Sequence, residues 1–209
     1  MMLRSEHPDQ TGANPEAVRS ALRRRCLAAR EGMPENERAL AAVRLAGHLS
    51  ALLRARPPGT LGFCWPIRGE FDARPLVAEL LRAGWRACLP SLPAPAAAMV
   101  FHRWTPGAAM QPGRYDIPVP AEAAACVPDT LLLPLVAFDA AGYRLGYGGG
   151  YFDRTLAALV PRPLTIGVGF ELARVDSTLP QAHDIPADVI VTEIGVFYSP
   201  PLAGGLPPA

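Results

Sequence analysis

The most informative pattern in the chain is LLLPLVAFDAAGYRLGYGGGYFDRTL, residues 131–156. It opens on the continuous apolar run Leu131–Phe138, which is typical of a strand buried on both faces of a sheet. Residues 139–142 then turn the chain, and a basic, glycine-rich loop leads into a helix expected over Tyr151–Leu159. A buried strand followed by a loop and a helix indicates an α/β fold.

The same alternation continues on both sides of this stretch. A first helix is expected from Asn14–Pro15, because Asn is a good N-cap and Pro suits the first helical position. Further helices are expected over Glu35–Ala55 and Arg74–Arg82. Strands are expected near Thr60–Trp65, Arg86–Leu89, Met99–Trp104, Leu164–Phe170 and Val189–Thr192. We therefore predict a single-domain layered α/β fold with a mainly parallel central sheet flanked by helices, and ligands outside the carboxyl ends of its strands.

The composition fits a soluble, single-domain protein with a small-molecule site. Its 209 residues are half hydrophobic, which suffices for one core over residues 14–198, and we expect disordered tails at 1–13 and 199–209. The formal net charge of +1 gives no sign of a nucleic-acid or membrane partner. The N-terminus lacks the apolar segment of a secretory signal, and no apolar run is long enough to span a bilayer. We expect a cytoplasmic protein that is a monomer or a weak homodimer.

The cysteines and histidines do not form a metal or disulfide pattern. The four cysteines and four histidines are dispersed, with no Cys-x-x-Cys pair. Zinc ligands usually come in closely spaced pairs, and disulfide frameworks belong to small secreted domains. We expect isolated thiols in a reducing compartment.

The glycine-rich loop carries the chemistry. Its glycines are Gly146, Gly148, Gly149 and Gly150. Without Cβ atoms their backbone can approach a ligand closely, and their amides can point at phosphate oxygens. Arg144 and Arg154 flank the loop, and Asp153 lies in the next helical turn, where it can hold Mg²⁺. The alternative is a tight strand-to-helix corner whose Asp153 only favours the helix N-terminus. The P-loop motif is absent, and the Gly-x-Gly lacks the third glycine of a dinucleotide site.

The run from Pro134 to Leu156 resembles the signature of the 5-formyltetrahydrofolate cyclo-ligase family, also called 5,10-methenyltetrahydrofolate synthetases, and agreement extends over roughly residues 15–193. The resemblance implies an enzyme that uses ATP to convert 5-formyltetrahydrofolate to 5,10-methenyltetrahydrofolate, releasing ADP and phosphate. It implies Mg²⁺ as cofactor, and reduced folate and ATP as the small-molecule substrates. It also implies a fold related to ribose-5-phosphate isomerase and coenzyme A transferases.

Site residues follow from the same resemblance. For ATP it implies Arg19, Arg23, Arg144, Leu145, Gly146, Tyr147, Gly148, Gly149, Gly150, Tyr151 and Phe152. Two of these, Arg23 and Arg144, carry the catalytic role of neutralising phosphate charge. For the folate it implies Trp65, Glu70, Tyr115, Tyr151 and Phe152, with Glu70 accepting hydrogen bonds from the pterin. For Mg²⁺ it implies Asp153 and Asp184.

The chain departs from the family pattern at three places. Arg19 stands where a lysine is usual, Phe152 stands where a second tyrosine is usual, and no glutamine follows shortly after Glu171. Two other functions are therefore weighed. One is a non-catalytic folate- or nucleotide-binding protein on the same fold. The other is a sugar-phosphate isomerase, which would use the glycine loop for phosphate without needing ATP or an acidic metal pair.

Overall fold

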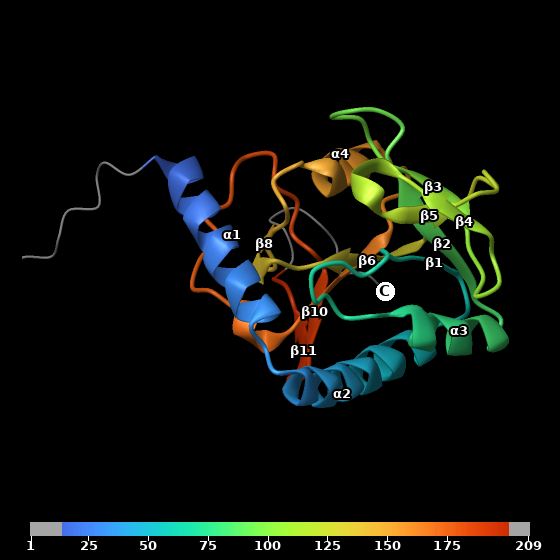
Figure 1. Ribbon diagram of the computed structural model, residues 1–209, viewed down its shortest axis with the longest axis horizontal. Helices are drawn as coiled ribbons and strands as arrows, with labels where there is room; N and C mark the ends of the chain where they lie inside the picture. The colour runs from blue at the N-terminus through green and yellow to red at the C-terminus, as the bar shows by residue number, and fades with distance from the viewer. Residues whose placement is uncertain (1–13, 201–209) are drawn as a thin grey trace, which may run out of the picture.

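The helices form over the segments predicted for them, and the first has a side-chain N-cap. In the computed structural model, which describes residues 14–200 (Figure 1), the helices are α1 (Pro15–Glu31), α2 (Glu35–Arg54), α3 (Arg74–Arg82) and α4 (Tyr151–Ala158). The Asn14 side chain accepts a hydrogen bond from the Glu16 amide at 3.0 Å, as expected of an N-cap. The predicted helices are confirmed. The tails predicted at 1–13 and 199–209 lie outside the described residues, apart from Ser199 and Pro200.

Seven strands form one mixed sheet in the order β11-β10-β9-β6-β1-β2-β3. They are β1 (Thr60–Gly62), β2 (Arg86–Ser91), β3 (Val100–Arg103), β6 (Thr130–Pro134), β9 (Leu164–Val168), β10 (Val189–Thr192) and β11 (Gly195–Tyr198). The five central strands are parallel, whereas the edge strands β3 and β11 are antiparallel to their neighbours. The mainly parallel sheet is confirmed, and β11 is a strand that the sequence pattern did not indicate.

The sheet is buried on both faces. Side chains along β6 alternate, so that Leu132 packs into the cluster formed with α2 and α3, whereas Leu131 and Leu133 pack into the cluster that contains Leu156 of α4. Figure 1 shows α2 and α3 along one side of the sheet and α4 on the other. This double burial explains why the central strand reads as a continuous apolar run.

The prediction of one strand over Leu131–Phe138 is wrong. β6 ends at Pro134, and β7 (Ala137–Phe138) pairs antiparallel with β8 (Arg144–Leu145) in a separate hairpin. The Val136 amide already donates to the Leu145 carbonyl at 2.9 Å, so the chain has left the main sheet by that residue. The hairpin packs under α1, where its apolar side chains meet Cys26 and Leu27. A buried hairpin and a buried strand have the same apolar composition, which is why the sequence could not separate them.

A second hairpin was also not expected from the sequence. β4 (Met110–Pro112) and β5 (Pro118–Pro120) pair antiparallel, and their proline content masks the strand pattern. Their connection holds Tyr115 and Asp116 at φ of 59° and 57°, a left-handed conformation that non-glycine residues rarely adopt. No helix among residues 14–200 is both long and apolar enough to cross a bilayer.

Candidate functional site

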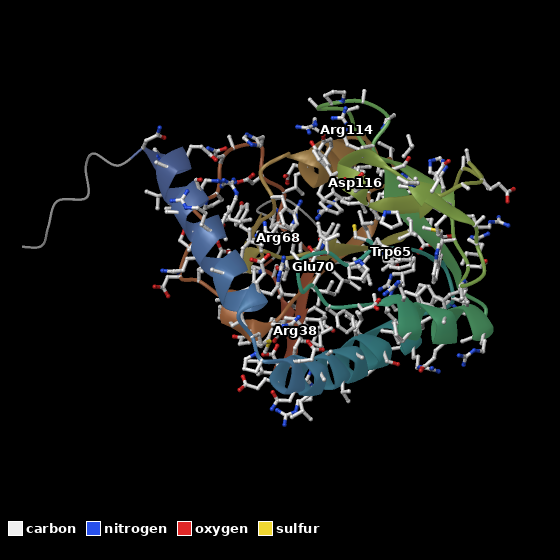
Figure 2. The ribbon with its side chains drawn as sticks, viewed as in Figure 1. Arg38, Trp65, Arg68, Glu70, Arg114 and Asp116 are labelled. Carbon is white, nitrogen blue, oxygen red and sulfur yellow. The ribbon has the colours of Figure 1, made fainter. Side chains whose placement is uncertain are left out.

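A cavity of about 620 Å³ opens at the carboxyl ends of the central strands. Small-molecule sites commonly measure roughly 300–1,000 Å³. Cys64 and Trp65 follow β1, Leu92 follows β2, and Pro134 ends β6; all four line the cavity. Figure 2 shows Trp65 and Glu70, from the loop after β1, on one side of this opening and Arg114, from the β4–β5 connection, on another. The cavity therefore lies where parallel α/β sheets usually bind ligands.

Most of the site residues predicted from the sequence meet in this cavity. The loop between β8 and α4 supplies one wall, α1 supplies Arg19 and Arg23, and the β1–α3 loop supplies Trp65 and Glu70. The exception is Leu145, which is fully buried against Cys26 and does not line the cavity. The structure thus assigns Leu145 to the core, because its side chain points from β8 toward α1.

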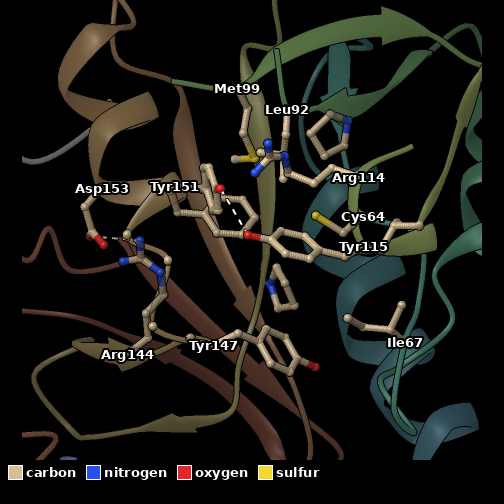
Figure 3. A pocket seen from close by; sticks show the side chains of 18 of the residues that line it. Cys64, Ile67, Leu92, Met99, Arg114, Tyr115, Arg144, Tyr147, Tyr151 and Asp153 are labelled. Atoms are coloured by element: carbon tan, nitrogen blue, oxygen red, sulfur yellow. Dashed lines mark hydrogen bonds and ion pairs between the residues drawn. The ribbon is translucent and has the colours of Figure 1, made fainter. Parts of the chain in front are cut away.

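An ion pair closes the glycine-rich loop. Arg144 is the last-but-one residue before the loop and Asp153 lies in the helical turn after it. The Arg144 Nη2 atom donates to Asp153 Oδ1 at 3.0 Å, as Figure 3 shows, and Arg144 Nη1 donates to the Ile185 carbonyl. Burial lowers the pKa of Arg144, and the charge of Asp153 opposes that shift. The pair therefore holds the two ends of the loop together.

The backbone of the loop is open toward the cavity. Gly148 and Gly150 have φ of 93° and 61°, which side-chain-bearing residues rarely adopt. A Cβ atom on Gly146 would meet no protein atom within 4 Å. None of the amides from Gly146 to Gly150 donates a hydrogen bond to another of the described residues. Such a run of unpaired amides is a binding surface for an anion.

Two arginines of α1 reach the same end of the cavity. Arg19 is buried and donates from Nη1 to Asp184 Oδ2 and to the Leu179 carbonyl, both at 2.7 Å. Burial raises the pKa of Asp184, but the hydrogen bonds from Arg19 and from the Gln181 amide outweigh it, so the pKa lies below its usual range. Arg23 pairs with the exposed Glu16 at 2.8 Å. The Nε atoms of both arginines are buried and have no hydrogen-bond partner among residues 14–200, although Arg19 Nε lies 3.8 Å from Glu16 Oε2, so each retains a donor.

The opposite end of the cavity holds a buried carboxylate. The Tyr147 hydroxyl donates to Glu70 Oε1 at 2.7 Å, and the Ile67 amide donates to Glu70 Oε2 at 3.1 Å. Arg30 Nη2 in turn donates to the Tyr147 hydroxyl at 2.6 Å. Burial raises the pKa of Glu70, and the Tyr147 hydrogen bond opposes that shift. A carboxylate with remaining lone pairs at a cavity wall can accept hydrogen bonds from ring N–H groups.

Sequence reasoning missed Arg30 as part of this end of the site. Its guanidinium also donates to the Leu135 carbonyl at 2.9 Å and to the Arg68 carbonyl at 3.0 Å, so it joins α1 to three loops. The available signal was its position on the same helical stripe as Arg19 and Arg23.

The aromatic residues surround the middle of the cavity. The Tyr115 hydroxyl lies 3.4 Å from the Tyr151 hydroxyl, although Tyr115 is largely exposed. The Arg144 guanidinium lies over the Phe152 ring at 5.9 Å, and that of Arg74 lies over the Trp65 ring at 4.3 Å. No sequence pattern indicated the other lining side chains. They include Arg68, Leu92, Met99, Arg114, Ile117, Val119, Gln181 and His183.

Mg²⁺ fits one of its two predicted carboxylates better than the other. Asp153 Oδ1 is taken by Arg144 and by the Ile185 amide, whereas Oδ2 has no partner among the described residues. Both oxygens of Asp184 accept from Arg19. No group of three His, Cys, Asp or Glu side chains within residues 14–200 could hold a metal. Mg²⁺ often takes only one or two carboxylates plus substrate phosphates, so Asp153 is a suitable ligand and Asp184 is not while Arg19 holds it.

Comparisons with known proteins agree with one another. The model of the 5-formyltetrahydrofolate cyclo-ligase family matches residues 15–193. The 5-formyltetrahydrofolate cyclo-ligase of Escherichia coli (strain K12) is 36% identical over 136 residues, covering 62% of this chain and 75% of that protein. That of Mycolicibacterium smegmatis is 31% identical over 188 residues, covering 84% and 92%.

Solved structures give the same result. The NMR structure of Aquifex aeolicus 5,10-methenyltetrahydrofolate synthetase matches with a TM-score of 0.76 and 31% identity, covering 87% of this chain and 92% of that one. The structure of a 5,10-methenyltetrahydrofolate synthetase from Mycoplasma pneumoniae matches with a TM-score of 0.70 and 26% identity, covering 84% and 98%.

Asp184→Asn should destabilise the protein by about 3 kcal/mol, because it leaves the buried guanidinium of Arg19 without its counter-charge. Urea unfolding measures this. Glu31→Gln, which breaks the exposed pair with Arg68, is the matched control and should cost less than about 1 kcal/mol. Because the folded pKa of Asp184 is lowered, its contribution is present above the ordinary aspartate pKa and is lost as pH falls through the folded value. The difference between wild type and Asp184→Asn should therefore shrink in acid; equal losses for the two variants at neutral pH would contradict this assignment.

Proposed function

The chain belongs to the 5-formyltetrahydrofolate cyclo-ligase family, and we infer that its reaction takes place in the cavity at the strand ends. The protein is a 5-formyltetrahydrofolate cyclo-ligase: it converts 5-formyltetrahydrofolate to 5,10-methenyltetrahydrofolate. The observation that supports the cavity as the reaction site is that its two ends carry groups of different chemistry. Unpaired amides and guanidinium groups lie at one end, and the buried carboxylate of Glu70 lies at the other.

We propose that the ATP triphosphate binds along the glycine-rich loop. The free amides from Gly146 to Gly150 would surround phosphate oxygens, and Arg19, Arg23 and Arg144 would supply positive charge. Each of these arginines already has a carboxylate partner and is held in place before a ligand binds. Such preorganisation lowers the cost of stabilising charge that develops in the transition state.

The folate would lie with its pterin against Glu70. The ionised carboxylate would accept hydrogen bonds from the pterin N–H groups, while Arg30 and Tyr147 keep it in position. The rings of Trp65, Tyr115, Tyr151 and Phe152 line the cavity and offer surfaces on which a flat ring system can stack.

This arrangement suits activation of an amide-like oxygen by phosphoryl transfer. The formyl oxygen would attack the γ-phosphorus, releasing ADP and giving a formyl carbon bonded to nitrogen and to an O-phosphate. The second nitrogen of the new ring would then attack that carbon, losing its proton, and phosphate would leave to give the methenyl bridge. The protein acts through positioning and charge neutralisation, and no side chain serves as a nucleophile.

Mg²⁺, if bound with ATP, would neutralise charge on the phosphate oxygens. We propose Asp153 as its protein ligand, because one of its oxygens is free of other partners in the described part of the chain. Asp184, which the resemblance paired with Asp153, would instead hold Arg19 against the phosphates. The kinship of the fold with ribose-5-phosphate isomerase and coenzyme A transferases, and the monomeric or weakly dimeric state, stay predictions.

The deciding experiment is growth of the long-wavelength absorbance of the methenyl product from 5-formyltetrahydrofolate with ATP and Mg²⁺. Product formation that stops when ATP is omitted is the expected result. Binding of both substrates without product would favour the non-catalytic alternative. Absence of binding of either the folate or ATP would favour a sugar-phosphate enzyme.

Arg144→Ala should lower kcat by about a hundredfold or more, because it removes a preorganised positive charge and opens the loop. Steady-state assays measure this, with thermal melting to show that the variant is folded. Arg162→Ala is the matched control, since Arg162 is also paired with an aspartate, at 3.1 Å, but does not line the cavity. Near-normal turnover of folded Arg144→Ala would rule out the role.

Gly146→Val should weaken ATP binding at least about tenfold while leaving the fold intact, because its side chain would enter open space at the cavity wall. Calorimetry measures the Kd for ATP. Gly107→Val is the matched control, since a Cβ atom there also meets nothing within 4 Å but lies away from this cavity. Unchanged affinity in Gly146→Val would reject the loop as the phosphate site.

Tyr147→Phe should move the acidic limb of kcat/KM for the folate to higher pH. The hydroxyl donates to the charged form of Glu70, so its loss raises a carboxyl pKa that burial has already raised, and less of the ionised acceptor remains at a given acidic pH. The pH profile of kcat/KM checks this, with Tyr143→Phe as the control, because Tyr143 does not line the cavity. An unshifted limb would mean that ionised Glu70 is not required.

A further inference from the structure

One arginine that lines the cavity forms no ion pair with any of the described residues. Five arginines line it, and four of them pair with carboxylates within 4.0 Å: Arg19 with Asp184, Arg23 with Glu16, Arg68 with Glu31 and Arg144 with Asp153. The fifth, Arg114, forms no ion pair with any of residues 14–200. A cation at a cavity wall without an internal counter-charge is suited to an anionic group of a ligand.

Arg114 is held in place by an unusual backbone. It lies in the β4–β5 connection, where the Gly113 amide donates to the Ile117 carbonyl at 3.0 Å and the next two residues are left-handed. Its guanidinium lies 5.7 Å from the centre of the Tyr115 ring, and the Tyr115 hydroxyl reaches Tyr151 on α4. Strained backbone of this kind persists where surrounding contacts maintain it, and is frequent at ligand sites.

The surface beside Arg114 is apolar. Leu92, Met99, Ile117 and Val119 all line the cavity. Figure 3 shows the Arg114 side chain next to Met99 and Leu92, with the Tyr115 ring between it and Tyr147. Figure 2 shows Glu70 and Arg114 well apart across the opening. An apolar wall that ends at a cation fits an aromatic ring that carries a carboxylate, and it does not suit a triphosphate.

We propose that Arg114 binds the glutamate carboxylates of the folate substrate, and this inference rests on the proposed function. With the pterin at Glu70, the p-aminobenzoyl ring crosses the apolar wall and the glutamate arrives at Arg114. The ATP phosphates have their own donors at the glycine-rich loop, so they do not require this arginine. Arg114 therefore determines specificity for folates that carry an ionised glutamate, and each added glutamate would extend toward solvent because Arg114 is exposed.

The test compares two substrates in two variants. One substrate is 5-formyltetrahydrofolate, and the other is its analogue with both glutamate carboxylates replaced by carboxamides. The variants are Arg114→Gln and the control Arg103→Gln, an exposed arginine of β3 that does not line the cavity. Steady-state kinetics gives kcat/KM for each folate and KM for ATP, and calorimetry gives Kd for both folates without requiring turnover.

Wild type and Arg103→Gln should prefer the carboxylate substrate roughly tenfold in kcat/KM and in Kd, a preference that falls as salt rises. Arg114→Gln should lose this preference while its kcat/KM for the carboxamide analogue and its KM for ATP stay unchanged. A preference retained in Arg114→Gln would overturn the proposal, and so would a rise in KM for ATP with both folates equally affected. If the wild-type protein made no product, the proposed function would be contradicted. The Kd values for the two folates would still show whether Arg114 binds the glutamate carboxylates.

Discussion

The site depends on one ion pair that spans the glycine-rich loop. Arg144 begins the two-residue strand β8, Asp153 belongs to the first turn of α4, and their contact at 3.0 Å fixes both ends of a segment whose glycines have no side chains to hold it. Burying the Arg144 guanidinium would be costly without that partner and the Ile185 carbonyl. Because the ends are fixed, the amides between them can stay unpaired and still keep one arrangement. The loop is thus accessible to an anion without being mobile at its base.

A second carboxylate, that of Asp139, stabilises the segments next to the glycine-rich loop. Asp139 is buried, and its Oδ1 accepts the amides of Ala141 and Tyr143 at 3.1 Å, which shapes the turn between β7 and β8. Its Oδ2 accepts the amide and hydroxyl of Thr178 at 3.0 and 2.8 Å. Through Thr178 it anchors the segment that carries Asp184. A single side chain therefore positions both the β7–β8 turn and the segment that pairs with Arg19, and its four hydrogen bonds offset the cost of burying its charge.

The two ends of the cavity are joined by Arg30. Its guanidinium donates to the carbonyls of Leu135 and Arg68 and to the hydroxyl of Tyr147, which contacts Glu70. Tyr147 belongs to the glycine-rich loop, and Glu70 belongs to the loop between β1 and α3. The glycine-rich loop and the Glu70 carboxylate are therefore parts of one hydrogen-bonded network. That continuity fixes the two ends of the cavity relative to each other, because neither end can move far without breaking a buried hydrogen bond.

Sequence patterns alone predict the helices, the central strands and the glycine-rich loop, since Asn14, the glycines and the apolar runs act through local backbone preferences and burial. The sequence also indicated most of the residues that meet in the cavity, because a long signature resembles a known family. The folded arrangement was needed to see that the apolar run breaks after Pro134 into a hairpin, and that Leu145 points into the core. Only the structure showed that Asp184 pairs with Arg19, 165 residues away in the chain. Partner choice among charged groups and the direction of a buried side chain depend on contacts between distant segments, which local sequence patterns do not record.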